Sequence, residues 1–279
     1  MIKSFSKYQA LGNNFIVLDE ICVHGKSRKF ENLARDICDP THGIGADGLL
    51  VLSGEPGVYR VDIYNADGSW AEKSGNGSRI AAMYLTNSGL ISGNSLDLIT
   101  GSGQSQIKLY AGNEQKRVIS ASLGVPDFNT KKIPVASDKK FFISQTIHCF
   151  NRAYITSAVS VGNPHLILFC DDFDFDWQTI GSELESHPMF PNRVNVGFVK
   201  VIDDKNIDIR DFERGVGPTD SSGTGAAAAV AISVMRGFTD RKVSVHSQAG
   251  ILRVYWDSKS DELSIKGPIE FIFSGEYDT

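Results

Sequence analysis

Two stretches of this chain repeat one another, and this repeat limits the possible folds more than any other feature of the sequence. The tripeptide LGN at 11–13 returns as VGN at 161–163, and SGNG at 74–77 returns as SGTG at 222–225. The two spacings are nearly equal, at 150 and 148 residues. Because the units of a solenoid are much shorter, the repeat predicts two similar domains.

Each copy is predicted to contain mostly strands and one main helix. In the first copy, short apolar runs separated by Gly, Asn and Ser indicate strands, at 15–18, 49–52, 59–64, 96–99 and 107–110. Helices are expected at 76–86 and 226–235, and a glycine follows each of them closely. The second helix, AAAAVAISVM, is apolar on every side, so we expect a sheet to wrap around it.

The seam between the copies is expected in the polar, Pro-bearing stretch at 125–134. The N-terminal lobe is therefore predicted to span 1–125 and the C-terminal lobe 126–266. The last segment, 267–279, is expected to return to the first lobe, because the first copy otherwise lacks a closing strand.

Composition and charge argue against several classes of protein. A net charge of −5, a pI near 5.7 and the lack of a basic run predict no nucleic-acid binding. The sequence contains no run of 18 apolar residues, so no membrane span is predicted. The N-terminus lacks the apolar core of a signal peptide, which favours a cytoplasmic protein. The six histidines form no ligand-spaced cluster, so no metal is expected. Without a CxxC pair, the cysteines are expected to be free thiols; they are Cys22, Cys38, Cys149 and Cys170.

The segment GIGADG at 43–48 fits the pattern GxGxxG without its usual context. A dinucleotide site needs a strand before this motif and a helix after it, whereas DPTH precedes it here and the strand-like LLVL follows it. We therefore expect these glycines to serve a tight turn. No GxSxG, Walker A or HExxH motif supports a hydrolase, an NTPase or a zincin.

The two Ser-Gly-x-Gly motifs are the strongest candidates for chemistry. A Gly-x-Gly at the start of a helix leaves backbone N–H groups free and favours a carboxylate or a phosphate. Two such starts, one per lobe, are expected to line a cleft between the lobes, where ligands often bind. The alternative is that Ser74 and Ser222 are plain N-cap residues and the glycines are turn residues. Two copies in the same context favour the ligand site.

Several segments, matched in order over nearly the whole length, resemble the diaminopimelate epimerase family. They are LGNNF, GIGADGLL, YNADGS, SGNGSR, VGNPH, RVNVGF, and FERGVG followed by SGTGA. The resemblance implies an α+β fold of two pseudo-symmetric lobes, each a strand barrel around a central helix. It also implies a reaction that inverts the carbon next to a carboxylate without pyridoxal phosphate. In that reaction a thiolate from one lobe takes a proton and a thiol from the other lobe returns one.

Both catalytic thiols of that family are replaced in this chain. The family has them just before GNG and GTG, where this sequence has Ser74 and Ser222. Pro218 also stands where glutamate is usual, and Ala227 where a small residue or a cysteine is common. A free cysteine has a pKa near 8.5; if a serine hydroxyl lies roughly five units higher, ionising it costs on the order of 7 kcal/mol more. We therefore expect these serines to run the two-thiol reaction inefficiently.

The resemblance also implies the remaining site residues. It assigns the catalytic positions to Ser74, Ser222, His165 and Glu213, of which the last two orient or assist the thiols. It assigns the far amino-acid end of the substrate to Asn13, Asn65, Asn195 and Arg214, and a further substrate contact to Asn163. The backbone N–H groups of Gly75, Asn76, Gly223 and Thr224 are expected to hold the reacting carboxylate. Taken singly, each asparagine also fits a turn and Arg214 also fits a surface charge.

Three functions stay open at this point. The first is an epimerase or racemase that acts on diaminopimelate or a similar amino acid, as in lysine biosynthesis, as a monomer or homodimer without a cofactor. It survives if the serines were introduced to trap a substrate, or if His165, Glu213 or Asp220 has become the base. The second is a catalytically silent amino-acid-binding paralogue. The third is a different isomerase or lyase that uses a histidine or carboxylate base on the same scaffold.

Overall fold

A computed structural model describes residues 2–20, 28–55 and 57–278 of the chain. The chain divides into two compact units. Unit 1 comprises Met1–Ser122 and Lys266–Thr279, and unit 2 comprises Leu123–Ile265. The chain thus passes into unit 2 after residue 122 and returns after residue 265, where the sequence had suggested 125 and 266.

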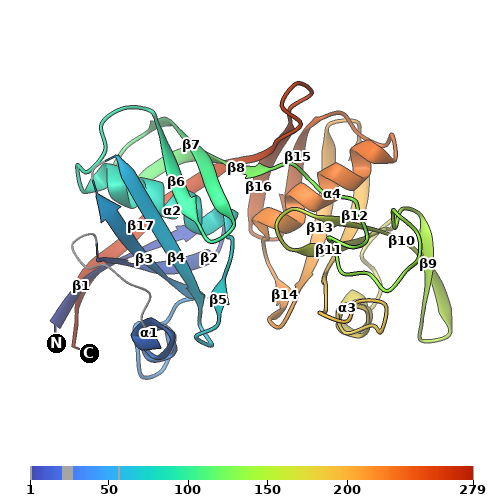
Figure 1. Cartoon of the computed structure of the whole chain (residues 1–279), viewed down its shortest axis with the longest axis horizontal. Coiled ribbons are helices and arrows are strands. Elements are labelled where there is room, and N and C mark those ends of the chain that lie inside the picture. Colours follow the sequence, from blue (N-terminus) through green and yellow to red (C-terminus); the bar gives the residue numbers. More distant parts are fainter. Residues whose placement is uncertain (1, 21–27, 56, 279) are drawn as a thin grey trace. The chain divides into compact units, whose positions relative to one another are not determined.

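Strands in unit 1 form a closed barrel (Figure 1). The strands of this unit are β1 (Ile2–Ala10), β2 (Asn13–Asp19), β3 (Gly48–Glu55), β4 (Val58–Asn65), β5 (Trp70–Ala71), β6 (Ser95–Thr100), β7 (Gly103–Gly112), β8 (Lys116–Gly124) and β17 (Leu263–Asp278). Among the described residues, eight of them pair in the cyclic order β17, β1, β2, β3, β4, β6, β7, β8 and back to β17. The register of β17 on β1 runs from Asp278 opposite Ile2 to Glu270 opposite Gln9. The C-terminal strand therefore completes this barrel.

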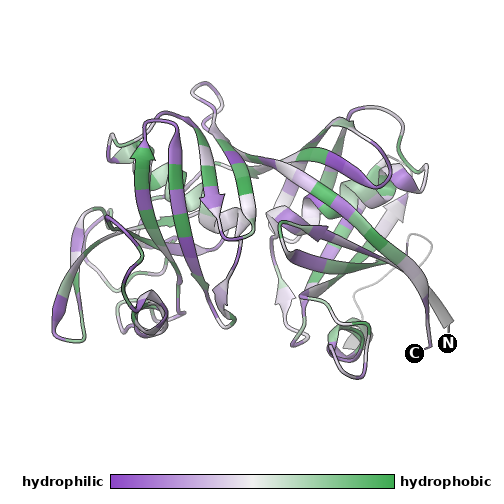
Figure 2. Ribbon diagram, turned by 180° about the vertical axis from the view of Figure 1, so that it is seen from behind, coloured by the Kyte–Doolittle hydropathy of each residue, from purple (hydrophilic) through white to green (hydrophobic). Residues whose placement is uncertain are grey.

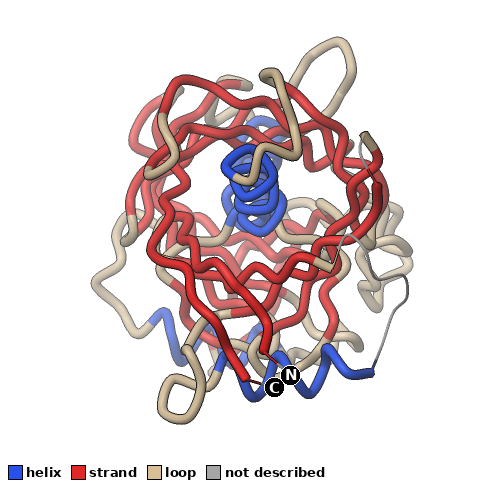
Figure 3. Tube along the Cα trace, turned by 90° about the vertical axis from the view of Figure 1, so that its left-hand side faces the viewer, coloured by secondary structure: helices blue, strands red, loops and turns tan. Residues whose placement is uncertain are grey.

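Helix α2 (Gly75–Asn87) runs inside the barrel of unit 1, as the view in Figure 3 shows. Apolar and polar residues alternate along the strands, which gives the banding in Figure 2, and the apolar face points at the helix. Ile80 and Met83 of α2 are fully buried against this face. Burial of each such side chain contributes about 1.5–3 kcal/mol, more than the glycine-rich start of the helix costs in propensity.

Unit 2 repeats this plan with a second enclosed helix. Its elements are β9 (Gln145–Cys149), β10 (Arg152–Ser160), β11 (Pro164–Phe169), α3 (Trp177–Glu185), β12 (Asn195–Asp203), β13 (Asn206–Glu213), β14 (Gly217–Thr219), α4 (Gly223–Met235), β15 (Lys242–Ser247) and β16 (Gly250–Trp256). Helix α4 is buried from Gly223 to Ser233, as its apolar sequence predicts, and only its last turn reaches solvent. It ends at Met235, and two residues later Gly237 has a φ of +71°, which favours glycine.

The two units share one order of strand pairing. In unit 1 the antiparallel pairs β1–β2, β3–β4 and β6–β7 are joined through the parallel pairs β2–β3 and β4–β6. In unit 2 the antiparallel pairs β10–β11, β12–β13 and β15–β16 are joined through the parallel pairs β11–β12 and β13–β15. The predicted α+β fold class, two pseudo-symmetric lobes of strands around a central helix, is confirmed.

Parallel neighbours need a crossover connection, and a short helix provides it in each unit. Helix α1 (Arg28–Cys38) lies between β2 and β3, and α3 lies between β11 and β12. The sequence analysis did not predict either helix.

The glycine-rich segment at 43–48 forms the turn between α1 and β3. Gly45 has a φ of +74°. A Cβ added at Gly43 would lie 2.2 Å from the carbonyl oxygen of Asp36, so any other residue would clash with the backbone of α1. Because a helix precedes the segment and a strand follows it, the order is opposite to that of a dinucleotide-binding motif. The predicted tight turn is confirmed.

The cysteines that the structure describes are free thiols, as predicted. They are Cys38, Cys149 and Cys170, while Cys22 lies outside the described residues. Burial raises the pKa of Cys38 to about 12 and the pKa of Cys170 to about 11, so neither is a reactive thiolate near neutral pH. Over residues 2–20, 28–55 and 57–278, no helix is long and apolar enough to cross a membrane.

Candidate functional site

Both serines of the repeated motif are N-cap residues of the enclosed helices. Ser74 has extended backbone angles, and its Oγ accepts a hydrogen bond from the Gly77 N–H at 3.0 Å. Ser222 does the same with the Gly225 N–H at 3.1 Å. Each hydroxyl therefore satisfies one N–H of the first helical turn.

The helix start in unit 1 is linked to strand β2 through amide side chains. Asn76 Nδ2 donates to Asn13 Oδ1 at 3.1 Å, and Asn13 Nδ2 donates to Asp47 Oδ2 at 3.2 Å. The Asp47 carboxylate also accepts the backbone N–H of Asn14 at 2.7 Å. Asp47 thus fixes the orientation of Asn13. Of the predicted site residues in unit 1, Asn13, Gly75 and Asn76 are brought together with Ser74.

Asn65 is held by a different set of contacts. It ends β4, and its Nδ2 donates to Ser69 Oγ at 2.9 Å within the turn that follows. Its strand pairs it with Gly48 at the start of β3, next to Asp47. No hydrogen bond found between described residues joins the Asn65 side chain to Ser74, Asn76 or Asn13.

A matching chain of polar side chains leads to the helix start in unit 2. Asn163 Nδ2 donates to Thr224 Oγ1 at 3.3 Å, and the Asn163 Oδ1 lies 3.0 Å from His165 Nε2. His165 is buried, and this burial, with the positive charge of Arg214, lowers its pKa to about 3. The imidazole is therefore neutral at physiological pH and donates its Nε2–H to the asparagine oxygen. It orients Asn163 but is a weak base.

Asn195 connects two further predicted residues in unit 2. It begins β12 opposite His165, its Nδ2 donates to the Pro164 carbonyl at 2.8 Å, and its Oδ1 accepts the Arg214 N–H at 3.0 Å. This amide thus fixes the turn that carries Arg214. Glu213, one residue earlier, accepts a hydrogen bond from Thr219 Oγ1 at 3.0 Å.

A buried carboxyl group beneath the start of α4 was not predicted. Asp211 of β13 is 5% exposed, and its carboxylate accepts the backbone N–H of Ser222. Burial raises the pKa of Asp211 well above its usual range, and the nearby charge of Glu213 adds to the rise. The carboxyl lies so close to α4 that a Cβ added at Gly225 would be 2.2 Å from Asp211 Oδ1.

This close approach predicts unequal effects of one substitution in the two motifs. Gly225→Ala forces Asp211 and the first turn of α4 apart, so we expect a loss of about 1–3 kcal/mol in the free energy of unfolding, as for other overpacked cores. In Gly77→Ala the added Cβ would lie 3.1 Å from Leu50 Cδ2, a side chain that is able to move. Helix propensity favours alanine equally at both positions. Urea denaturation of the two variants measures the difference, and equal stabilities would contradict the packing argument.

Three functional candidates were missed, and the sequence contains a signal for two of them. Asp47 is the acidic residue of the GIGADG segment, and Arg79 ends the SGNGSR segment. Arg79 is completely buried, and its Nη2 donates to Asn76 Oδ1 at 2.6 Å. Asp211 sits at an ordinary inward position of a strand, where the alternating pattern calls for an apolar residue.

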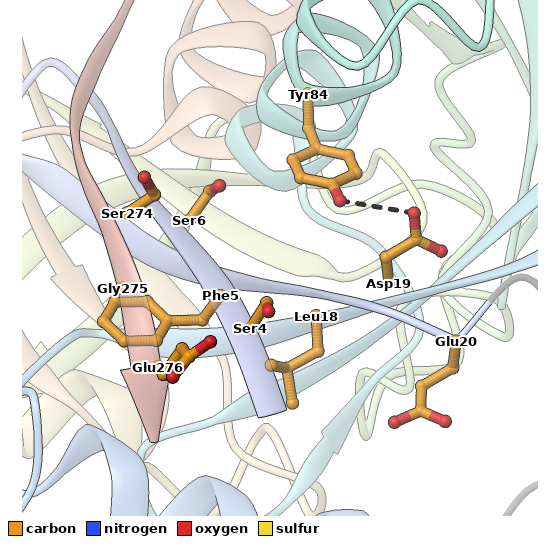
Figure 4. Close-up of a pocket in the computed structure, with 10 residues that line it drawn as sticks. All are labelled: Ser4, Phe5, Ser6, Leu18, Asp19, Glu20, Tyr84, Ser274, Gly275 and Glu276. Carbon is orange, nitrogen blue, oxygen red and sulfur yellow. Dashed lines mark hydrogen bonds between the residues drawn. The ribbon is translucent and has the colours of Figure 1, made fainter. Parts of the chain in front are cut away.

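A pocket of about 590 Å³ in unit 1 is lined by other residues (Figure 4). Strands β1 and β17, the end of β2 and Tyr84 of α2 line it, and Tyr84 Oη donates to Asp19 Oδ2 at 3.2 Å. None of its lining residues is a predicted site residue. In the part of the chain that the structure describes, no group of three or more His, Cys, Asp or Glu is placed to hold a metal ion.

Comparison with known proteins identifies the family. The family model described as diaminopimelate epimerase matches residues 5–128 and 157–272, which include both Ser-Gly-x-Gly motifs. The chain belongs to the diaminopimelate epimerase family. The diaminopimelate epimerase of Caldanaerobacter subterraneus subsp. tengcongensis is 39% identical over 276 residues, 98% of each chain. That of Pelotomaculum thermopropionicum is 36% identical over 275 residues, again 98% of each chain.

A solved structure shares the fold of this diaminopimelate epimerase family member at low sequence identity. It is a hydroxyproline epimerase from Agrobacterium vitis with bound trans-4-hydroxy-L-proline. The TM-score is 0.74 at 13% identity, over 99% of this chain and 92% of that one. The likeness extends over both units.

Proposed function

We propose that this chain binds the carboxylate of diaminopimelate or a similar amino acid and transfers protons at its α-carbon without pyridoxal phosphate. The observation that carries this proposal is the pair of Ser-Gly-x-Gly helix starts, one in each unit, within a full-length match to diaminopimelate epimerases. Backbone N–H groups at a helix start, together with the helix dipole, favour a bound carboxylate.

The proposed reaction also needs stabilisation of a carbanion. The N–H groups of Gly75, Asn76, Gly223 and Thr224 are the proposed donors for the carboxylate oxygens, on which negative charge grows when the α-proton leaves. Arg214 is the proposed partner of the far carboxylate, because its planar fork binds a carboxylate through two parallel hydrogen bonds. Asn13, Asn65, Asn163 and Asn195 are the proposed hydrogen-bonding groups around the rest of the substrate.

The proposed turnover is slow, because each thiol position holds a serine. Ser74 Oγ and Ser222 Oγ already accept helix N–H groups, and no described histidine or lysine hydrogen-bonds to either of them. An activating base is what a serine needs to react. His165 is a poor replacement base, since burial holds its pKa near 3. The same geometry supports a second candidate function, an amino-acid-binding protein without turnover.

Calorimetry and deuterium exchange on the same preparation test the proposal. Titration with diaminopimelate is expected to give saturable heat that Arg214→Ala abolishes or weakens strongly. Arg193→Ala is a matched control, because Arg193 lies near the same turn but pairs with Glu185 at 3.3 Å. In D2O, the α-proton of bound diaminopimelate is expected to exchange slowly. Binding without exchange would favour the silent paralogue, and neither binding nor exchange would contradict the proposal.

A further inference from the structure

A line of hydrogen bonds in unit 1 joins an exposed carboxylate to a buried guanidinium through two amide side chains. Asp47 Oδ2 accepts from Asn13 Nδ2 at 3.2 Å, and Asn13 Oδ1 accepts from Asn76 Nδ2 at 3.1 Å. Asn76 Oδ1 then accepts from Arg79 Nη2 at 2.6 Å. We call these four side chains the amide chain. It connects the segment before β3, the start of β2 and the start of α2.

The two ends of the amide chain fix the direction of every bond in it. A carboxylate offers only acceptors, and a guanidinium offers only donors. Burial lowers the pKa of Arg79 to about 9, so the guanidinium stays protonated at neutral pH and donates. Asn76 must therefore turn its oxygen to Arg79 and its nitrogen to Asn13, and Asn13 must turn its nitrogen to Asp47. An asparagine without such neighbours can exchange the places of its oxygen and nitrogen by rotation about χ2.

Both ends of the amide chain are themselves fixed to the backbone. Asp47 is exposed, but its Oδ2 also accepts the Asn14 N–H at 2.7 Å and Asn14 Nδ2 at 3.0 Å. Its own N–H donates to the Asn14 carbonyl at 3.0 Å. Arg79 is fully buried, and its Nε donates to the Gly75 carbonyl at 3.2 Å. The two amides are therefore held between two anchored groups.

Unit 2 keeps the asparagine but lacks the guanidinium. Asn163, the counterpart of Asn13, donates to Thr224 Oγ1 at the start of α4. At the spacing of 148 residues that relates the two helix starts, Ala227 takes the place of Arg79. The shared fold therefore forms without an amide chain, which points to a function of the chain that is specific to unit 1.

We propose that Asp47 and Arg79 are positioning residues that hold Asn13 and Asn76 in one amide orientation for binding the amino-acid substrate. This inference rests on the proposed function, in which Asn13 and the backbone N–H of Asn76 contact that substrate. Each of the two amide nitrogens has one N–H left after its bond within the amide chain, and no described residue accepts it. These groups point in fixed directions before the substrate arrives, so less conformational freedom is lost on binding.

Side-chain amide signals in a proton–nitrogen correlation NMR spectrum report on the amide chain without substrate or turnover. The signals of Asn13 and Asn76 are assigned by their loss in Asn13→Ala and Asn76→Ala. Asp47→Ala is expected to fold, because it removes an exposed side chain and leaves no cavity. It is expected to shift the signals of both asparagines, although no hydrogen bond joins Asp47 to Asn76 directly. Arg79→Met is expected to shift both from the opposite end.

Two controls come from the same unit. Asn65 Nδ2 donates to Ser69 Oγ outside the amide chain, so its signal is expected to stay in place in every variant. Asp39 lies between α1 and β3, as Asp47 does, and its Oδ1 accepts the backbone N–H groups of Thr41 and His42. Asp39→Asn is expected to leave the signals of the amide chain and the affinity for diaminopimelate unchanged.

Calorimetry with diaminopimelate tests whether the fixed orientation serves binding. Asp47→Ala is expected to weaken the affinity roughly threefold to tenfold, about what one net hydrogen bond contributes. Asp47→Asn keeps an acceptor oxygen and is expected to restore part of the affinity and of the original signals. A shift confined to Asn13, or full affinity in Asp47→Ala, would overturn the inference even if Arg79→Met does not fold. If the unsubstituted protein binds no diaminopimelate, the proposed function fails, whereas the amide signals still decide whether the amide chain exists.

Discussion

Replacing Ser74 and Ser222 together by cysteine is expected to increase α-proton exchange of diaminopimelate roughly 100-fold or more. The two hydroxyls are N-caps at equivalent places, so a thiol at each position starts from the same backbone geometry. Roughly five pKa units separate serine from cysteine, which corresponds to on the order of 7 kcal/mol for forming the anion. The alkoxide is the stronger base once formed, and Brønsted behaviour returns part of this deficit. The part of this free-energy deficit that is not returned predicts the increase in exchange rate, which deuterium incorporation in D2O measures.

A matched control distinguishes an effect of thiols at the two helix starts from a general effect of introducing a buried cysteine. Ser233 is also a fully buried serine of α4, but it lies at the other end of the helix and its Oγ donates to the Ala229 carbonyl at 2.7 Å. Ser233→Cys is expected to leave the exchange rate unchanged. If the double variant exchanges no faster than the unsubstituted protein, or if the unsubstituted protein already exchanges rapidly, the assignment of residues 74 and 222 as proton-transfer groups is wrong.

Asp211→Asn is expected to make the protein more stable at pH 8 and to leave its stability near pH 4 almost unchanged. Burial raises the pKa of Asp211 in the folded state above that in the unfolded chain. Between those two pKa values the folded state holds one proton more than the unfolded state, so the stability of the unsubstituted protein falls as the pH rises. The slope is about 1.4 kcal/mol per pH unit within that window. Asparagine keeps an oxygen for the Ser222 N–H and removes the titration, and the expected gain at pH 8 is about 1–3 kcal/mol.

Urea denaturation at a series of pH values checks this expectation, with Asp257→Asn as a control of opposite sign. The partly exposed Asp257 carboxylate accepts the backbone N–H groups of Ser260 and Lys259 and the hydroxyl of Tyr255, which together lower its pKa. Its contribution to stability is present above the unfolded pKa and is lost as the pH falls. Asp257→Asn is therefore expected to lower stability at neutral pH. A parallel pH dependence of the two variants would show that Asp211 is not a buried neutral acid.

The predicted part of the candidate site depends on short, local signals. Ser74 and Ser222 were identified as helix starts because Gly-x-Gly followed by an apolar run is a local pattern, and the N-cap bonds to Gly77 and Gly225 follow from the same few residues. The contacts between Asn76 and Asn13, and between Thr224 and Asn163, join residues 63 and 61 positions apart. Only the tertiary fold of each unit sets these distances.

The two crossover helices differ in how clearly the sequence marks them. Helix α1 has apolar residues at 30, 33, 34, 37 and 38, which all lie buried on one side, so a local helical signal for it was present in the sequence. Helix α3 is only nine residues long. So short a helix gains most of its stability from packing and is weakly marked in a sequence. The parallel pairs β2–β3 and β11–β12 require a crossover, but that requirement appears only once the strand order is known.

The sequence by itself determined the repeat, the two enclosed helices and the serines at their starts, because each is a pattern of nearby residues whose local physics is strong. The tertiary structure decided which ionisable side chain lies buried beneath the start of each enclosed helix. Nothing in their sequence context marks Arg79 and Asp211, yet the fold buries Arg79 beneath the first turn of α2 and Asp211 beneath the first turn of α4. Burial removes water from around both groups, so the pKa of Asp211 rises well above its usual range and the pKa of Arg79 falls to about 9, a difference between the two units that the sequence pattern does not reveal.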